Sequence, residues 1–136
     1  MGPTQYVVVV TGHSLGAAVA QMMAHELKEW NPTVYNFGQP RIGNKEYATY
    51  TTNVINLYRT THNKDLVPHT PPESFGFYHS SIEIFESDTG LLKECSSTNG
   101  EDPTCSNQFK MSEFSTKDHH VYLTHDMDCD KSILPY

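Results

Sequence analysis

A run of β-branched residues near the start of the chain is followed by a helical pattern. Residues 6–11 contain four consecutive valines, and such a run predicts a strand buried on both faces, as in a parallel sheet covered by helices. Apolar residues then recur at steps of three and four, which predicts an amphipathic helix that ends at Asn31-Pro32. The apolar positions of this helix are Leu15, Ala18, Val19, Met22, Met23 and Leu27.

Further strands and one short helix are predicted downstream, separated by polar stretches. The strands are expected at residues 33–37, 54–59, 80–86 and 91–95, the helix at 44–51, and loops at 60–76 and 96–115. The last two strands are expected to pair as a hairpin. Strands that alternate with helices favour an α/β sheet over an all-β or a helical fold.

Composition narrows the class of protein. The 136 residues leave room for one small domain and exclude a two-domain enzyme. Sixteen acidic against nine basic residues give a net charge of −7, which argues against nucleic-acid binding. No stretch approaches the roughly 20 apolar residues of a membrane span, and residues 1–4 lack the basic start of a secretory signal. The residues contain no nucleotide-binding glycine motif and no zinc-ligand spacing, so we expect neither cofactor nor metal.

A serine motif lies between the first strand and the first helix. Gly12-His13-Ser14-Leu15-Gly16 is a Gly-x-Ser-x-Gly sequence in the strand-to-helix context that gives the motif its meaning. The glycines are expected to let backbone approach closely, so that the Ser14 hydroxyl stands free above the sheet. The helix N-terminus makes the Leu15 N–H a candidate oxyanion donor. An ordinary strand-to-helix turn with a capping serine is the alternative interpretation.

A serine nucleophile needs a base and an orienting acid, which follow it in the chain order Ser, Asp, His in α/β-hydrolases. Asp65 comes after the third predicted strand, at the edge of the sheet where such folds present side chains. A loop aspartate that caps its own turn is the alternative. Chain order leaves three histidines as candidate bases: His119, His120 and His125.

Four stretches together resemble a known family. Residues 9–18, 36–43, 65–72 and 118–122 resemble, in order and spacing, the C-terminal half of the class 3 lipases, the fungal-type triacylglycerol lipases and related feruloyl esterases. The resemblance implies a single, truncated α/β-hydrolase domain over residues 1–136. Its sheet would be mostly parallel with flanking helices, and the N-terminal strands and the lid would be missing. A strand edge left open in this way is a predicted aggregation site.

The resemblance also implies roles for the candidate residues. Ser14 would be the nucleophile and Asp65 the orienting acid. In the family the catalytic histidine begins a His-x-x-Tyr sequence, which His119 and Tyr122 match, so His119 is the expected base and His120 the alternative. The implied function is a serine hydrolase that cleaves acylglycerols at an oil–water interface through an acyl-enzyme. The alternatives are a feruloyl or phospholipid esterase, or a catalytically silent fragment that only binds lipid surfaces or a partner.

Three cysteines leave at least one without an intrachain partner. The resemblance implies a disulfide between Cys95 and Cys105. It implies a secreted or luminal protein as well, and this favours the disulfide over the alternative of two free thiols in a reducing compartment. It also implies that the N-terminal half of the family fold would supply a lid, a second oxyanion donor and a partner for Cys129.

Overall fold

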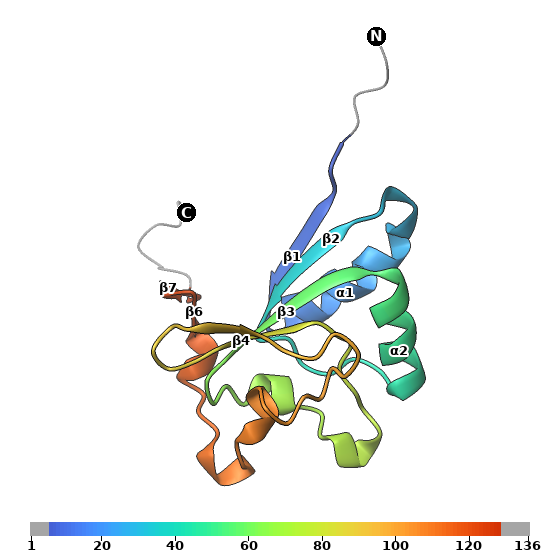
Figure 1. Ribbon diagram of the computed structural model, residues 1–136. Helices are drawn as coiled ribbons and strands as arrows, with labels where there is room; N and C mark the ends of the chain where they lie inside the picture. The colour runs from blue at the N-terminus through green and yellow to red at the C-terminus, as the bar shows by residue number, and fades with distance from the viewer. Residues whose placement is uncertain (1–5, 129–136) are drawn as a thin grey trace, which may run out of the picture.

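A five-stranded sheet with helices packed against it forms the centre of the molecule. The computed structural model describes residues 6–128, and its strands lie side by side in chain order (Figure 1). They are β1 (Val9–His13), β2 (Thr33–Phe37), β3 (Asn56–His62), β4 (Glu83–Glu86) and β5 (Leu92–Glu94). The first four are parallel, and β5 runs antiparallel to β4. The expected mostly parallel α/β sheet with a terminal hairpin is therefore confirmed.

Within residues 6–128, two α-helices and several short 3₁₀ helices lie between or after these strands. The α-helices are α1 (Leu15–Glu26) and α2 (Lys45–Val54). The 3₁₀ helices are η1 (Lys28–Trp30), η2 (Val67–His69), η3 (Glu73–Phe75), η4 (Ser106–Gln108), η5 (Met111–Glu113) and η6 (Asp118–His120). A two-stranded ribbon of β6 (Val121–Tyr122) and β7 (His125–Asp126) follows η6. Within residues 6–128, no helix combines the length and the apolar character that crossing a membrane requires.

The boundaries around β3 differ from the sequence prediction. The strand expected at residues 54–59 begins at Asn56, because α2 continues through Val54 and the Ile55 N–H still bonds the Thr51 carbonyl at 2.9 Å. The strand then continues to His62, paired with β4, so the loop expected at 60–76 starts three residues later. Backbone pairing with a distant strand overrides the polar composition of this segment.

Helix α1 faces the sheet with its small residues, not with its large apolar ones. Its most buried positions are Ala17, Ala18, Ala20, Gln21 and Ala24. Four large apolar side chains of the predicted stripe are instead exposed: Leu15, Val19, Met22 and Met23. Small side chains let the helix approach the strands closely, and periodicity alone does not tell which of two apolar stripes does so.

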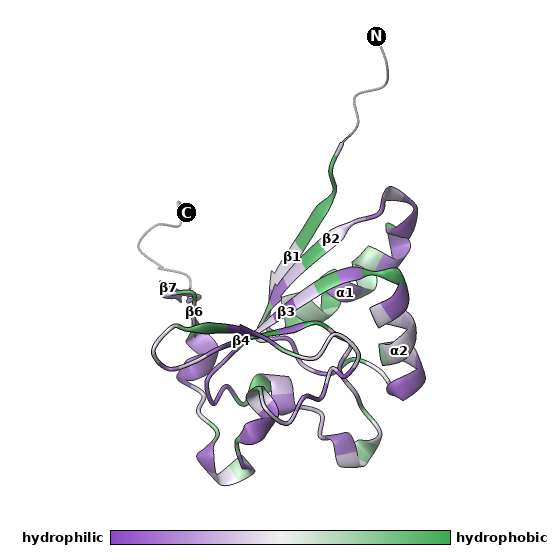
Figure 2. Ribbon diagram, viewed as in Figure 1, coloured by the Kyte–Doolittle hydropathy of each residue, from purple (hydrophilic) through white to green (hydrophobic). Residues whose placement is uncertain are grey.

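Strand β1 is not buried on both faces, contrary to the sequence prediction. It forms one edge of the described sheet and pairs only with β2 among residues 6–128. Val9 is 57% exposed and Val7, just before the strand, is 84% exposed. Figure 2 shows this apolar segment running beyond the rest of the sheet. Two small apolar clusters form the core: Ala24, Val34, Ile55 and Leu57 in one, and Phe85, Cys95 and Cys105 in the other.

Candidate active site

Ser14 occupies a strained turn between β1 and α1. Its backbone has φ 58° and ψ −128°, a conformation that residues other than glycine rarely adopt. A Cβ on Gly12 would come within 2.3 Å of the Gly16 carbonyl oxygen and 2.6 Å of the Ala17 nitrogen, so this position requires glycine. Both glycines of the motif were expected from the sequence to allow close backbone approach. This is wrong for Gly16, where an added Cβ would meet nothing within 4 Å.

Three side chains from distant parts of the chain form a hydrogen-bonded row. The Ser14 Oγ lies 2.8 Å from His119 Nε2, and His119 Nδ1 lies 2.9 Å from Asp65 Oδ2. Because a carboxylate only accepts, Nδ1 carries the proton and Nε2 is left to accept from the serine hydroxyl. His119 and Asp65 are shielded from solvent, since their side chains are 12% and 1% exposed.

Asp65 is fixed by donors besides His119. It follows the end of β3, and its Oδ1 accepts a hydrogen bond from the Val67 N–H at 2.8 Å. Its Oδ2 also accepts from the Tyr122 hydroxyl. Tyr122 is fully buried, and burial together with the neighbouring carboxylate raises the pKa of its phenol well above the usual value. The phenol therefore stays protonated and remains a donor to Asp65.

The turn that carries His119 is bound to the end of β3. The Asp118 carboxylate accepts from the Asn63 side chain at 2.9 Å and from the Lys64 N–H at 3.0 Å. His62 Nδ1 donates to the Asp118 carbonyl at 3.0 Å. These contacts place residue 119, and not 120, over the serine.

The two other histidines considered as bases lie apart from Ser14. The His120 side chain is about half exposed, and its Nδ1 donates a hydrogen bond to the Asp128 carboxylate at 2.7 Å. His125 lies in β7 and is exposed. Of the three histidines left open by chain order, only His119 is hydrogen-bonded to the serine within residues 6–128.

The Leu15 N–H is at the first position of α1, next to the nucleophile. Among the described residues it has no hydrogen-bond partner, and the Leu15 side chain is 72% exposed. Free N–H groups at a helix N-terminus favour negative charge. This N–H is therefore available to an oxyanion formed at Ser14.

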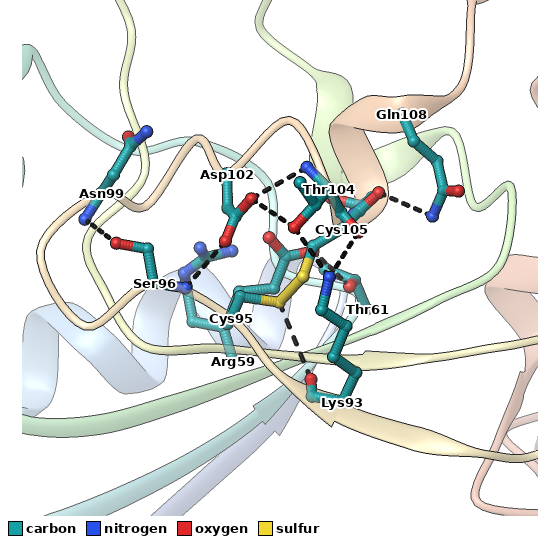
Figure 3. The surroundings of a disulfide bond; sticks show 12 residues. Arg59, Thr61, Lys93, Cys95, Ser96, Asn99, Asp102, Thr104, Cys105 and Gln108 are labelled. Atoms are coloured by element: carbon teal, nitrogen blue, oxygen red, sulfur yellow. Dashed lines mark hydrogen bonds between the residues drawn. A yellow bond between two sulfur atoms is a disulfide. The ribbon is translucent and has the colours of Figure 1, made fainter.

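The predicted disulfide between Cys95 and Cys105 is present, with the two Cα atoms 6.3 Å apart. Figure 3 shows the polar loop that it closes, in which Asp102 accepts hydrogen bonds from the backbone of Ser96 and Thr104. Glu83 lies beside the two sulfurs, and this is the one His/Cys/Asp/Glu group within residues 6–128 compact enough for a metal. Its sulfurs are disulfide-bonded and lack the thiolate charge that binds metal. Cys129 lies outside the described residues.

Sequence reasoning missed two residues that shape the site. Tyr122 served only to mark the histidine frame, yet its hydroxyl contacts Asp65 directly. Gly38 has φ +57°, and a Cβ there would come within 3.0 Å of the His119 ring and of the Tyr122 hydroxyl. A glycine directly after a strand, such as Gly38 after residues 33–37, is a weak signal, because most turn glycines contact no functional group.

A row of serine, histidine and carboxylate at the carboxyl ends of a parallel sheet is the arrangement typical of the α/β-hydrolase fold. Comparison with known proteins agrees. The sequence model "Lipase (class 3)" matches residues 2–75, and the chain belongs to this family.

Individual relatives show how much of the length of a family member this chain covers. A lipase from Rhizopus niveus is 40% identical over 140 residues, covering 96% of this chain but 29% of that protein. Secreted mono- and diacylglycerol lipase 1 from Fusarium solani is 47% identical over 80 residues, covering 57% of this chain and 24% of that protein. A solved triacylglycerol lipase whose catalytic centre is a serine protease triad superposes with a TM-score of 0.83 and 36% identity, covering 90% of this chain and 49% of that one. The chain thus spans less than half the length of these relatives.

Proposed function

We propose that this chain carries the catalytic residues of a serine carboxylic-ester hydrolase acting on acylglycerols. The observation that carries the proposal is the continuous row from the Ser14 hydroxyl through His119 to Asp65, with separations of 2.8 Å and 2.9 Å. The tautomer that this row requires leaves His119 Nε2 free to take the serine proton.

The proposed reaction proceeds in two steps. The Ser14 Oγ attacks the ester carbonyl carbon while His119 Nε2 takes its proton, and the Leu15 N–H donates to the oxyanion. The tetrahedral intermediate collapses to an acyl-enzyme as His119 gives the proton to the leaving alcohol. Water, deprotonated by His119, then attacks the acyl carbon. The second tetrahedral intermediate collapses as His119 returns this proton to the Ser14 Oγ, which releases a carboxylic acid and restores the serine hydroxyl. Asp65 holds the imidazole tautomer and stabilises the imidazolium in both steps.

The substrate class and location rest on the relatives and on the disulfide. Of the relatives described above, one is named simply a lipase, one a triacylglycerol lipase and one a secreted mono- and diacylglycerol lipase. A structural disulfide at Cys95 and Cys105 fits an oxidising compartment. The names of the relatives support an acylglycerol substrate at an oil–water interface, and the disulfide together with the secreted relative supports a secreted or luminal protein.

We further propose that a segment equivalent to the N-terminal half of the family fold completes the site. It would pair with the open edge of β1, supply a lid and a second oxyanion donor, and offer a partner to Cys129. The exposed side chains of Val9, on the edge strand β1, and of Leu15, next to Ser14, support this, because both leave large apolar surface uncovered. One oxyanion donor is worth about 2.7–4 kcal/mol of transition-state stabilisation, so its absence slows catalysis without removing the nucleophile.

Labelling with a fluorophosphonate probe tests the proposed function. Native source material is labelled, the Ser14 peptide is identified, and the mass of the labelled polypeptide is measured. Recombinant variants Ser14→Ala and His119→Ala should lose labelling, whereas Ser112→Ala, which removes an exposed serine, should keep it. Labelling of Ser14 on a larger polypeptide would support both the hydrolase function and the proposed N-terminal segment. Labelling of a polypeptide of 136 residues would show that Ser14 reacts without that segment.

A detectable chain that never reacts at Ser14 would overturn the hydrolase proposal. It would favour the catalytically silent interpretation, in which the chain only binds a lipid surface or a partner. If Ser14 does react, hydrolysis of triacylglycerol, phospholipid and feruloyl esters compared side by side separates the lipase from the two alternative esterases.

A further inference from the structure

The His13 ring lies against one face of the ring of the proposed base, His119. It is the last residue of β1 and directly precedes Ser14. Its ring stacks on the His119 ring with centroids 4.5 Å apart and planes 29° apart. It also meets the Tyr122 ring edge-on at 5.8 Å. One imidazole thus contacts both side chains that bind Oδ2 of Asp65.

A hydrogen bond links the same ring to the backbone of the His119 turn. His13 Nε2 lies 2.8 Å from the His119 carbonyl oxygen, across 106 residues of chain. A carbonyl only accepts, so Nε2 carries the proton in this contact. His13 therefore contacts His119 in two ways: its ring stacks on the His119 ring, and its Nε2–H bonds the His119 main chain. It does so from the position directly before the proposed nucleophile.

The surroundings of His13 keep its ring neutral near neutral pH. Burial is the main cause that lowers its pKa below the usual value, and the neighbouring His119 and His120 rings act in the same direction. The hydrogen bond to the His119 carbonyl and the Asp65 charge oppose this in part. A neutral ring stacks on His119 without repelling the imidazolium that forms there during reaction.

We propose that His13 is a positioning residue that holds the His119 ring in line between Ser14 and Asp65. The proposal rests on the proposed hydrolase function, because positioning matters only if His119 acts as a base. It predicts that the two restraints are separable. A glutamine at position 13 keeps an N–H that can reach the His119 carbonyl but removes the ring, and a phenylalanine keeps a ring but removes the donor.

The test compares His13→Gln and His13→Phe with the wild-type chain by two measurements. The first is the second-order rate constant for fluorophosphonate labelling of Ser14 as a function of pH. The second is the proton NMR signal of His119 Nδ1–H and the titration of its ring, which need no catalysis. His25 supplies matched controls, because it is also half-buried, stacks on Tyr50 with centroids 5.6 Å apart and bonds the Thr51 hydroxyl at 2.9 Å.

We expect each His13 variant to lower the labelling rate constant by about 10-fold to 100-fold, the loss typical of a misplaced catalytic group. We also expect a displaced pH midpoint and a weakened or shifted His119 Nδ1–H signal. His25→Gln and His25→Phe should change neither quantity. The two substitutions at position 13 differ in shape, so a folding defect in one leaves the other as a test.

One result would count against the proposal for His13, and a different result would count against the proposed function. If labelling, pH midpoint and the His119 signal of both His13 variants match the wild type, His13 does not position His119. If the wild-type chain is not labelled at all, the hydrolase proposal fails. The NMR comparison then still decides whether His13 orders the His119 ring.

Discussion

The Tyr122 hydroxyl donates its hydrogen bond to Oδ2 of Asp65, the same carboxylate oxygen that receives His119 Nδ1–H. Tyr122 belongs to β6, which has only two residues, and the Tyr122 ring is completely buried. The aromatic ring therefore connects the small β6–β7 ribbon to the end of β3. It explains why an aromatic residue three positions after the histidine belongs to the site itself.

Replacement Tyr122→Phe should destabilise the fold and slow the site without abolishing it. It removes a hydrogen bond to a charged group, which costs about 1.5–3 kcal/mol of unfolding free energy. Asp65 keeps its contacts with Val67 and His119, so labelling of Ser14 should slow but persist. Urea denaturation and probe kinetics measure both effects. Tyr58→Phe is the control, since no hydrogen bond of its hydroxyl exists among the described residues; equal losses in both variants would contradict the assignment.

Replacement Gly38→Ala should disturb His119 directly. The backbone there has φ +57°, and the new Cβ would lie 3.0 Å from His119 Cε1, His119 Nδ1 and the Tyr122 hydroxyl. We expect loss of about 1–2 kcal/mol from the left-handed backbone alone and a large fall in Ser14 labelling from the displaced ring.

Gly76 gives the matched control for this prediction. It also has a positive φ, of +85°, but an added Cβ would meet nothing within 4 Å. Gly76→Ala should therefore lose similar stability and keep its labelling rate. If the two alanine variants label alike, steric contact between residue 38 and His119 has no bearing on the site.

The strand–helix order was predictable because each element has its own local pattern. Residues 33–37 were expected as a strand and form β2 with the same bounds. The hairpin of β4 and β5 was also expected, because its strands flank a turn at residues 88–90. The orientation of α1 was not predictable, since Ala17 and Met22 both fit a helical period and only packing on the sheet selects the alanine.

The site was predictable to the extent that motif and chain order define it. Ser14 and Asp65 follow from strand ends, and His119 was preferred to His120 through the spacing to Tyr122. The stack of His13 on His119 was not predictable, because it depends on how the turn after residue 117 folds back over β1. Contacts across 106 residues of chain leave no local trace in the sequence.

Reduction of the disulfide should lower stability and loosen the loop that carries Glu101. The Cys95–Cys105 bond closes a loop of 10 residues, for which chain entropy gives about 2–3 kcal/mol. Thermal or urea unfolding with and without reductant measures the difference. The double variant Cys95→Ser/Cys105→Ser should match the reduced wild type and show no response to reductant. A reductant effect that persists in the double variant would assign the sensitivity to Cys129 instead.

Acid should weaken the fold through Glu101. Burial would raise the pKa of this carboxyl, but hydrogen bonds and charge from Arg41, aided by His79 and Asn107, outweigh it and lower the pKa to about 2. Arg41 binds both carboxylate oxygens at 2.8 Å. A carboxyl whose pKa falls from 4.5 to about 2 on folding contributes stability that is complete above 4.5 and lost as pH falls toward 2. The contribution is at most about 3 kcal/mol.

Glu101→Gln isolates this contribution, because the amide has no proton to bind in that range. Urea denaturation across the window should show the wild-type stability falling toward that of the variant as the pH decreases. Glu94→Gln is the control, since Glu94 is exposed on β5 and should leave the acid-dependent fall unchanged. If the gap between wild type and Glu101→Gln stays constant from pH 4.5 down to about 2, the pair with Arg41 does not link folding to protonation.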